Sequence, residues 1–160
     1  MFSLPENCKI VKLYGGATNG HASGTDFISC KNAHKVWIVG YTWGTTAADY
    51  IVSLLEATDV AAGTQAAVTA TFPIWKCIAT TSLDLLAQQS DANHLDIDPN
   101  GVDSTLLFVL EWDPAKFTPG YDCLAVDGTT GDAADYVVFL AFIQERYPSR
   151  VATQYSAIID

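Results

Sequence analysis

Positively charged residues are scarce in this 160-residue chain. It has eight Lys and Arg against eighteen Asp and Glu, which gives a formal net charge of −10 at pH 7. Proteins that bind nucleic acids or anionic membrane surfaces draw much of their affinity from Lys and Arg. The composition therefore argues against nucleic acid and membrane as partners.

Long hydrophobic runs are also missing. No stretch approaches the roughly 20 consecutive apolar residues that a transmembrane helix needs. The segment Met1 to Gly16 lacks the charged start and continuous apolar centre of a secretion signal. We therefore expect a protein that is made in the cytoplasm.

Metal-binding and redox motifs are not found among the four cysteines. Cys8, Cys30, Cys77 and Cys123 show no CxxC spacing and no close histidine partner, so neither a zinc site nor a redox centre is predicted. Three of the four lie in apolar, strand-like runs, where cysteine behaves as a small hydrophobic residue. Buried free thiols are favoured over disulfides.

Catalytic signatures are equally scarce. The histidines His21, His34 and His94 stand in no HExxH motif, and the chain has no GxSxG elbow and no glycine-rich phosphate loop. A nucleophilic Cys77 or Cys123 would lack local context. We predict a protein that is not an enzyme, with no catalytic residues and no cofactor.

One acidic segment resembles the first half of a calcium-binding loop. Asp96, Asp98 and Asn100 occupy ligand positions 1, 3 and 5, and a glycine follows at position 6. Position 12 is Leu107 instead of a bidentate Glu, and Pro99 stiffens the loop. We interpret the segment as an Asp-Pro-Asn-Gly turn, predict no metal site, and keep calcium binding as the alternative.

The residues that are abundant indicate a packed β protein. Hydrophobic residues make up 49% of the chain and charged residues 16%, and fourteen of the eighteen acids are Asp, which favours turns. We predict one domain over residues 1–160, with residues 1–24 as an N-terminal arm, first strand and loop, and 151–160 as a tail. Eight segments rich in β-branched and aromatic residues predict strands: 8–14, 25–30, 34–43, 50–57, 65–72, 105–112, 121–126 and 136–143.

Short turns between these strands predict an all-β fold, an antiparallel β-sandwich that is jelly-roll-like, with long loops and little helix. The segment Ser82 to Val102 is the least regular. We expect it to cross from one sheet to the other, beginning with a short helix through Leu83, Leu86 and Ala87.

Three of the predicted strands are apolar on both faces: 36–43, 136–143 and, for the most part, 106–112. In 36–43 one face carries Val36 and Ile38 while the other carries Trp37, Val39 and Tyr41, and 136–143 follows the same pattern. A two-sheet sandwich buries one face of each sheet. The second apolar face therefore indicates contact with another copy, another protein or an overlying loop.

The basic residues gather near the two ends of the chain. Six of the eight lie there, including Lys9, Lys12, Arg146 and Arg150, whereas eleven acids and one base lie between Asp84 and Asp135. If the ends meet in space they form a basic pole. The alternative is a set of scattered, solvated side chains.

The order of several phrases resembles a known family, the small virion proteins encoded near the major capsid protein of tailed double-stranded DNA bacteriophages. Some members of this family are capsid decoration or cement proteins. The phrases are KNAHKVWIV (31–39), LLEATDVAAGTQAAV (54–68), FPIW (72–75), LEWDPA (110–115), GYDCLAV (120–126), ERYPS (145–149) and YSAIID (155–160).

The resemblance implies a non-enzymatic protein that stabilises a phage head by binding the major capsid protein. It would be made in the host cytoplasm, lie on the outer surface of the capsid, and form a homo-oligomer, with a trimer favoured. We expect the basic pole and an apolar C-terminal tail to make the contacts with the capsid or with other copies. The candidate residues are Lys9, Lys12, Arg146, Arg150, Tyr155, Ile158 and Ile159.

Two alternatives stay open. The chain could be a tail or head-completion protein of the virion. It could also be a calcium- or glycan-binding module for host attachment, with aromatic rings stacked on sugars. Core packing is the favoured use of Trp37, Trp43, Trp75 and Trp112, because they lie in or beside strand segments.

Overall fold

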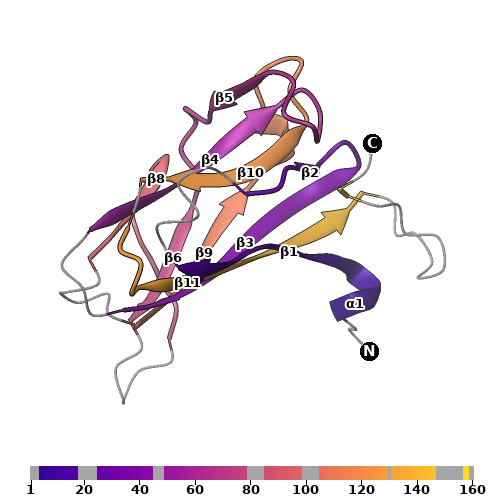
Figure 1. Ribbon diagram of the computed structural model, residues 1–160. Helices are drawn as coiled ribbons and strands as arrows, with labels where there is room; N and C mark the ends of the chain where they lie inside the picture. The colour runs from indigo at the N-terminus through magenta and orange to yellow at the C-terminus, as the bar shows by residue number, and fades with distance from the viewer. Residues whose placement is uncertain are drawn as a thin grey trace.

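A computed structural model describes residues 4–17, 25–44, 49–78, 85–98, 105–129, 131–146 and 157–158. Two antiparallel sheets pack against each other (Figure 1), which confirms the predicted β-sandwich. The strands are β1 (Cys8–Ala17), β2 (Ile28–Ser29), β3 (Ala33–Trp43), β4 (Tyr50–Ala57), β5 (Gln65–Ala67), β6 (Ile74–Ile78), β7 (Ala87–Gln88), β8 (His94–Ile97), β9 (Thr105–Trp112), β10 (Cys123–Gly128) and β11 (Tyr136–Glu145). A one-turn helix α1 (Leu4–Asn7) precedes β1, and a 3-10 turn, η2 (Pro114–Lys116), follows β9.

The strand order is that of a jelly roll. One sheet has six strands in the order β1-β11-β3-β9-β6-β7, and the other has the order β2-β10-β4-β5, with β8 also paired to β4. The chain passes repeatedly between the sheets, so that its first strand pairs with its last and its second with its second-last. This antiparallel wrapping of two sheets is typical of jelly rolls.

The core lies between the two sheets and follows the strand alternation. The inner face of the six-stranded sheet contributes Ile38, Phe108 and Phe139, all fully buried, and the rings of Phe108 and Phe139 meet edge to face at 6.1 Å. The five-stranded sheet contributes Val52 and Leu54 from β4. Burial of these side chains supplies the main driving force for the sandwich.

The crossing connection is confirmed for residues 85–98, but the helix expected in it is wrong where the structure describes it. Ala87 lies in β7, which pairs with β6 at the edge of the six-stranded sheet, while Leu83 lies outside the described residues. An isolated bridge joins Phe72 to Ala92, and β8 then pairs with β4. Pairing with open sheet edges satisfies the backbone here, where an isolated helical turn would be marginal.

Candidate functional site

The six-stranded sheet carries a second apolar surface on the side away from the core, here called the outer face. Its side chains alternate with core residues along β3, β9 and β11, and they are half-buried or exposed. The sequence pattern of strands that are apolar on both faces is therefore confirmed. The outer face consists of Ile10, Trp37, Val39, Tyr41, Trp43, Trp75, Leu107, Val109, Tyr136, Val138, Leu140 and Phe142.

Three exposed rings at one end of the outer face form what we call the aromatic ridge. Tyr41, Trp43 and Tyr136 are 41%, 43% and 42% exposed. Trp43 stacks on Tyr136 across the β3–β11 pair with ring centroids 5.2 Å apart, and Tyr41 lies 5.8 Å from Trp43. Of the four tryptophans that core packing could explain, Trp112 is fully buried, but Trp43 is a surface residue.

An apolar hollow of about 330 Å³ lies toward the other end of the same face. Trp37, which lines the hollow, is six residues from Trp43 along β3, or about 20 Å, whereas the near edge of the hollow at Val39 is two residues from Tyr41. The helix α1, which the sequence did not predict, supplies one wall. The lining residues are Leu4, Cys8, Trp37, Val39, Val109 and Phe142.

Charges on the outer face are few and nearly balanced. Lys12 and Lys35 lie on this side of the sheet, and Glu111 is the one acidic side chain that the described strands place there. Lys35 forms an ion pair with Glu111, and its ammonium group lies 5.6 Å from the centre of the Trp37 ring. The face thus carries little of the chain's negative charge.

The structure brings part of the predicted basic pole together. The first residue of β1, Cys8, pairs with Gln144 near the end of β11, so Lys9 and Arg146 lie at the same end of the sheet. Arg146 donates from Nε to the carbonyl of Ala33 at 3.0 Å. Lys12 lies further along β1, on the outer face, and Arg150 lies outside the described residues.

Acidic neighbours offset several of these terminal bases. Partial burial lowers the pKa of Lys9, and the charge of Glu145 opposes that shift. Lys31 lies 3.9 Å from a carboxylate oxygen of Asp122. This end of the sandwich therefore carries both basic and acidic side chains, several of them close to a group of opposite charge.

The described part of the C-terminal tail docks on its own chain. Ala157 is 6% exposed within the core, and its carbonyl accepts a hydrogen bond from the Ser29 backbone N–H at 2.8 Å. Ile158 is 47% exposed. Tyr155 and Ile159 lie outside the described residues.

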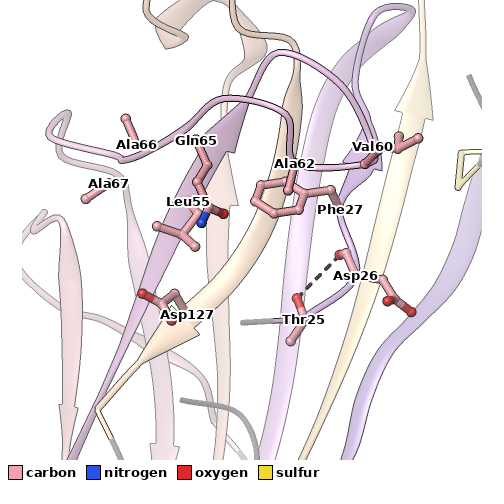
Figure 2. A pocket seen from close by; sticks show the side chains of 11 residues that line it. Thr25, Asp26, Phe27, Leu55, Val60, Ala62, Gln65, Ala66, Ala67 and Asp127 are labelled. Atoms are coloured by element: carbon pink, nitrogen blue, oxygen red, sulfur yellow. Dashed lines mark hydrogen bonds between the residues drawn. The ribbon is translucent and has the colours of Figure 1, made fainter. Parts of the chain in front are cut away.

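A second hollow, of about 690 Å³, lies on the outer side of the five-stranded sheet (Figure 2). Leu55 lies in its centre, Phe27 and Ala62 stand together on one side, and the carboxylates of Asp26 and Asp127 lie toward its rim. The lining residues include no cysteine, histidine or lysine. Small apolar side chains share the lining with the polar groups of Thr25, Gln65 and the two carboxylates.

The loop between β4 and β5 forms one wall of this second hollow. Asp59 accepts a hydrogen bond from the Gly63 backbone N–H at 3.1 Å, and Ala62 adopts a positive φ of 59°. Sequence reasoning missed this site. A run of small residues, with Ala61, Ala62, Ala66 and Ala67 around one turn, is the signal that marks it.

The acidic segment that resembles a calcium loop begins inside a strand. Asp96 belongs to β8 and pairs with Ile51, its side chain is 76% exposed, and it lies 3.6 Å from His94. Asn100 lies outside the described residues. Within the described ranges, no group of three His, Cys, Asp or Glu side chains is placed to hold a metal ion.

The predicted buried free thiols are confirmed. All four cysteines are buried, and no disulfide joins any two of them. Burial raises the pKa of Cys8 and, far more strongly, that of Cys30. Thiols that resist deprotonation are poor nucleophiles. Cys77 and Cys123, which the sequence analysis considered as nucleophiles, are 6% and 0% exposed.

No family model matches this chain, and no curated protein or solved structure matches it either. Among the described residues, no helix has the length and apolar character to span a membrane. The surface features above therefore carry the functional argument.

Proposed function

We propose that this chain is a non-enzymatic structural protein of a phage virion, which decorates the head by binding the major capsid protein and associates with copies of itself. The outer face of the six-stranded sheet is the observation that carries this proposal. Large contiguous apolar patches rimmed by polar residues mark protein interaction sites. A protein that works by assembly needs such a surface and needs no reactive centre.

The fold is compatible with this role. Jelly rolls occur in viral capsid domains and in lectins. Because one fold serves many functions, a jelly roll by itself does not select this role, whereas the exposed apolar outer face supports it. The capsid is proposed as the binding partner because several sequence phrases resemble those of phage virion proteins.

Contact with the shell is assigned to the end of the sandwich where β1 begins and β11 ends. Lys9 and Arg146 contribute positive charge at this end of a chain that is otherwise acidic. Lys12, further along β1, and Arg150 belong to the same group in sequence. Complementary charge at an interface sets register and speeds encounter. An acidic capsid exterior would fit this end better than any other described part of the chain.

Imaging of virions that contain this chain tests the proposal directly. We expect its density on the outside of the head, with a copy number in the hundreds per particle by quantitative mass spectrometry. About a dozen copies or fewer, at the neck or tail, would instead support a tail or head-completion protein. Absence from purified particles would refute both assignments.

The aromatic ridge favours a second candidate, a glycan-binding module for host attachment. Exposed rings such as Trp43 and Tyr136 stack on the apolar faces of sugars. A ligand that binds only the folded state raises its thermal midpoint as ligand concentration rises. Melting with a panel of sugars, and with calcium, distinguishes the candidates, because a decoration protein should show no shift with either.

A further inference from the structure

We propose that the outer face of the six-stranded sheet binds the same face of a second copy of this chain. In this pairing the aromatic ridge of each copy enters the apolar hollow of the other. The inference rests on the self-association part of the proposed function and is independent of the phage head.

The positions of the ridge and the hollow make the face complementary to itself. The stacked rings of Trp43 and Tyr136 are exposed toward one end of the face, and the shallow hollow beside Trp37 and Phe142 lies toward the other end. A two-fold axis that lies between two such faces and runs across the strands reverses the strand direction of the second copy. Each ridge then lies opposite the other copy's hollow, and both contacts form at once, as in any isologous dimer.

The size of the face matches what a stable dimer requires. Its main strands are β1, β11, β3, β9 and β6. Five strands spaced by about 4.8 Å and about 30 Å long give a projected area of roughly 700 Å². Each partner in a standard interface contributes roughly 800 Å², so complete burial of this face is sufficient for a specific pair.

The charge distribution favours a second copy over a charged partner. The chain carries a net charge of −10, and two copies repel each other over most orientations. On the outer face Glu111 is already paired with Lys35, and Lys12 adds one positive charge. Face-to-face packing therefore joins the molecules through a surface with little net charge, where repulsion between copies is smallest.

The pairing predicts a dimer, whereas the resemblance to phage proteins favours a trimer. A three-fold arrangement joins two different patches on each copy. The outer face is one continuous patch on one sheet, and it is buried completely by a single opposing face. Two sheets that pack face to face with nearly aligned strands form one of the two standard sheet packings.

Sedimentation equilibrium of the purified chain in reducing buffer tests the inference. We expect a particle of twice 17.2 kDa. Trp43→Lys should weaken dimerisation at least 100-fold, because it places a charge where the ring is buried. Ala61→Lys adds the same charge on the exposed β4–β5 loop of the other sheet and should leave dimerisation unchanged. A monomeric or trimeric wild-type chain, or equal effects of the two variants, overturns the inference.

A double-mutant cycle tests the fit of ridge to hollow. Trp43 and Leu4 lie at opposite ends of one copy, so their effects should multiply if they act separately. If the ridge enters the partner's hollow, Trp43→Ala and Leu4→Ala should each weaken the dimer about 10-fold, and the double variant should weaken it clearly less than 100-fold. A simple product of the two effects refutes the ridge-to-hollow contact. Circular dichroism melts confirm that each variant is folded.

The outcomes separate this inference from the virion role. A dimer that fails to bind phage heads refutes the decoration proposal and leaves the dimer standing. A monomer that binds heads through the outer face, seen as loss of binding in Trp43→Lys, refutes the dimer and assigns the face to the capsid protein. A monomer that binds sugars through the ridge assigns the face to glycans.

Discussion

Gly40 lies directly opposite Phe108 across the β3–β9 pair, and a Cβ atom at Gly40 would come within 2.1 Å of the Phe108 ring. The absence of a side chain at this position leaves the space in which the ring packs. Phe108 in turn meets Phe139 from β11. This arrangement joins the three central strands of the six-stranded sheet on their core side.

The first prediction concerns this packing. Gly40→Ala should lower the free energy of unfolding by about 1–3 kcal/mol or more, because an overpacked core forces side chains or backbone to shift. Gly15→Ala is the matched control, since its added Cβ would meet the flexible end of Lys12 at 3.2 Å and Val138 at an ordinary contact distance of 3.8 Å. Urea denaturation measures both variants. Equal stabilities would show that the Phe108 ring moves aside freely.

The second prediction concerns the tail. Ala157→Asp should destabilise the fold by about 1–3 kcal/mol, because it places a charged group where Ala157 is 6% exposed. Ile158→Asp should leave the unfolding free energy within about 0.5 kcal/mol, since surface substitutions usually have small effects. Thermal and urea melts measure both.

The same pair of variants separates intramolecular docking from contact with a neighbour. If the tail also binds the shell or another copy, Ile158→Asp should reduce occupancy on particles while keeping wild-type stability. Occupancy equal to wild type would limit the role of the described tail residues to their own chain.

The third prediction concerns the cationic end of the sandwich. Replacing Lys9, Lys12, Arg146 and Arg150 by Glu should weaken binding to heads, and the loss should shrink as salt increases, because screening removes long-range attraction. Binding to purified heads is measured at about 50 mM salt, where screening is weak, and at about 500 mM salt, where screening is strong. Unchanged binding at low salt would assign shell contact to another surface.

The fourth prediction concerns pH. Burial raises the pKa of Cys30 well above its ordinary value, so the folded state keeps the thiol proton that the unfolded state loses above about pH 8.5. The contribution of Cys30 to the free energy of unfolding is therefore fully present below that pH. It declines as pH rises, by up to about 1.4 kcal/mol per pH unit. Cys30→Ala should reduce the slope of stability against pH between 8.5 and 10. An identical slope would show that Cys30 is not the group responsible.

Strand pairing explains which parts of the fold could be predicted. Segments such as 36–43 and 136–143 alternate with a period of two and are rich in β-branched and aromatic residues, so their strands follow from local pattern. The strands β7 and β8 have two and four residues, too few to show a period. Ala87 belongs to a strand because the edge of β6 is available for pairing, which no local sequence signal reveals.

The candidate functional surfaces also combine features that the local sequence predicts with features that depend on how the strands pair. Buried thiols and strands with two apolar faces could be predicted, because hydrophobicity and alternation belong to each segment. The aromatic ridge joins β3 to β11, and the apolar hollow joins α1, β1, β3, β9 and β11. These partners are distant in the chain, and their register depends on how the sheet assembles.

From its sequence alone, this protein is determined to be an acidic β-sandwich with more apolar sheet surface than one sandwich buries. That much follows because the side chains of a strand alternate between its two faces. Only the tertiary structure places the exposed rings of the aromatic ridge and the apolar hollow on one face of one sheet. The physical reason is that non-local strand pairing, with one register out of several, decides which distant side chains become neighbours.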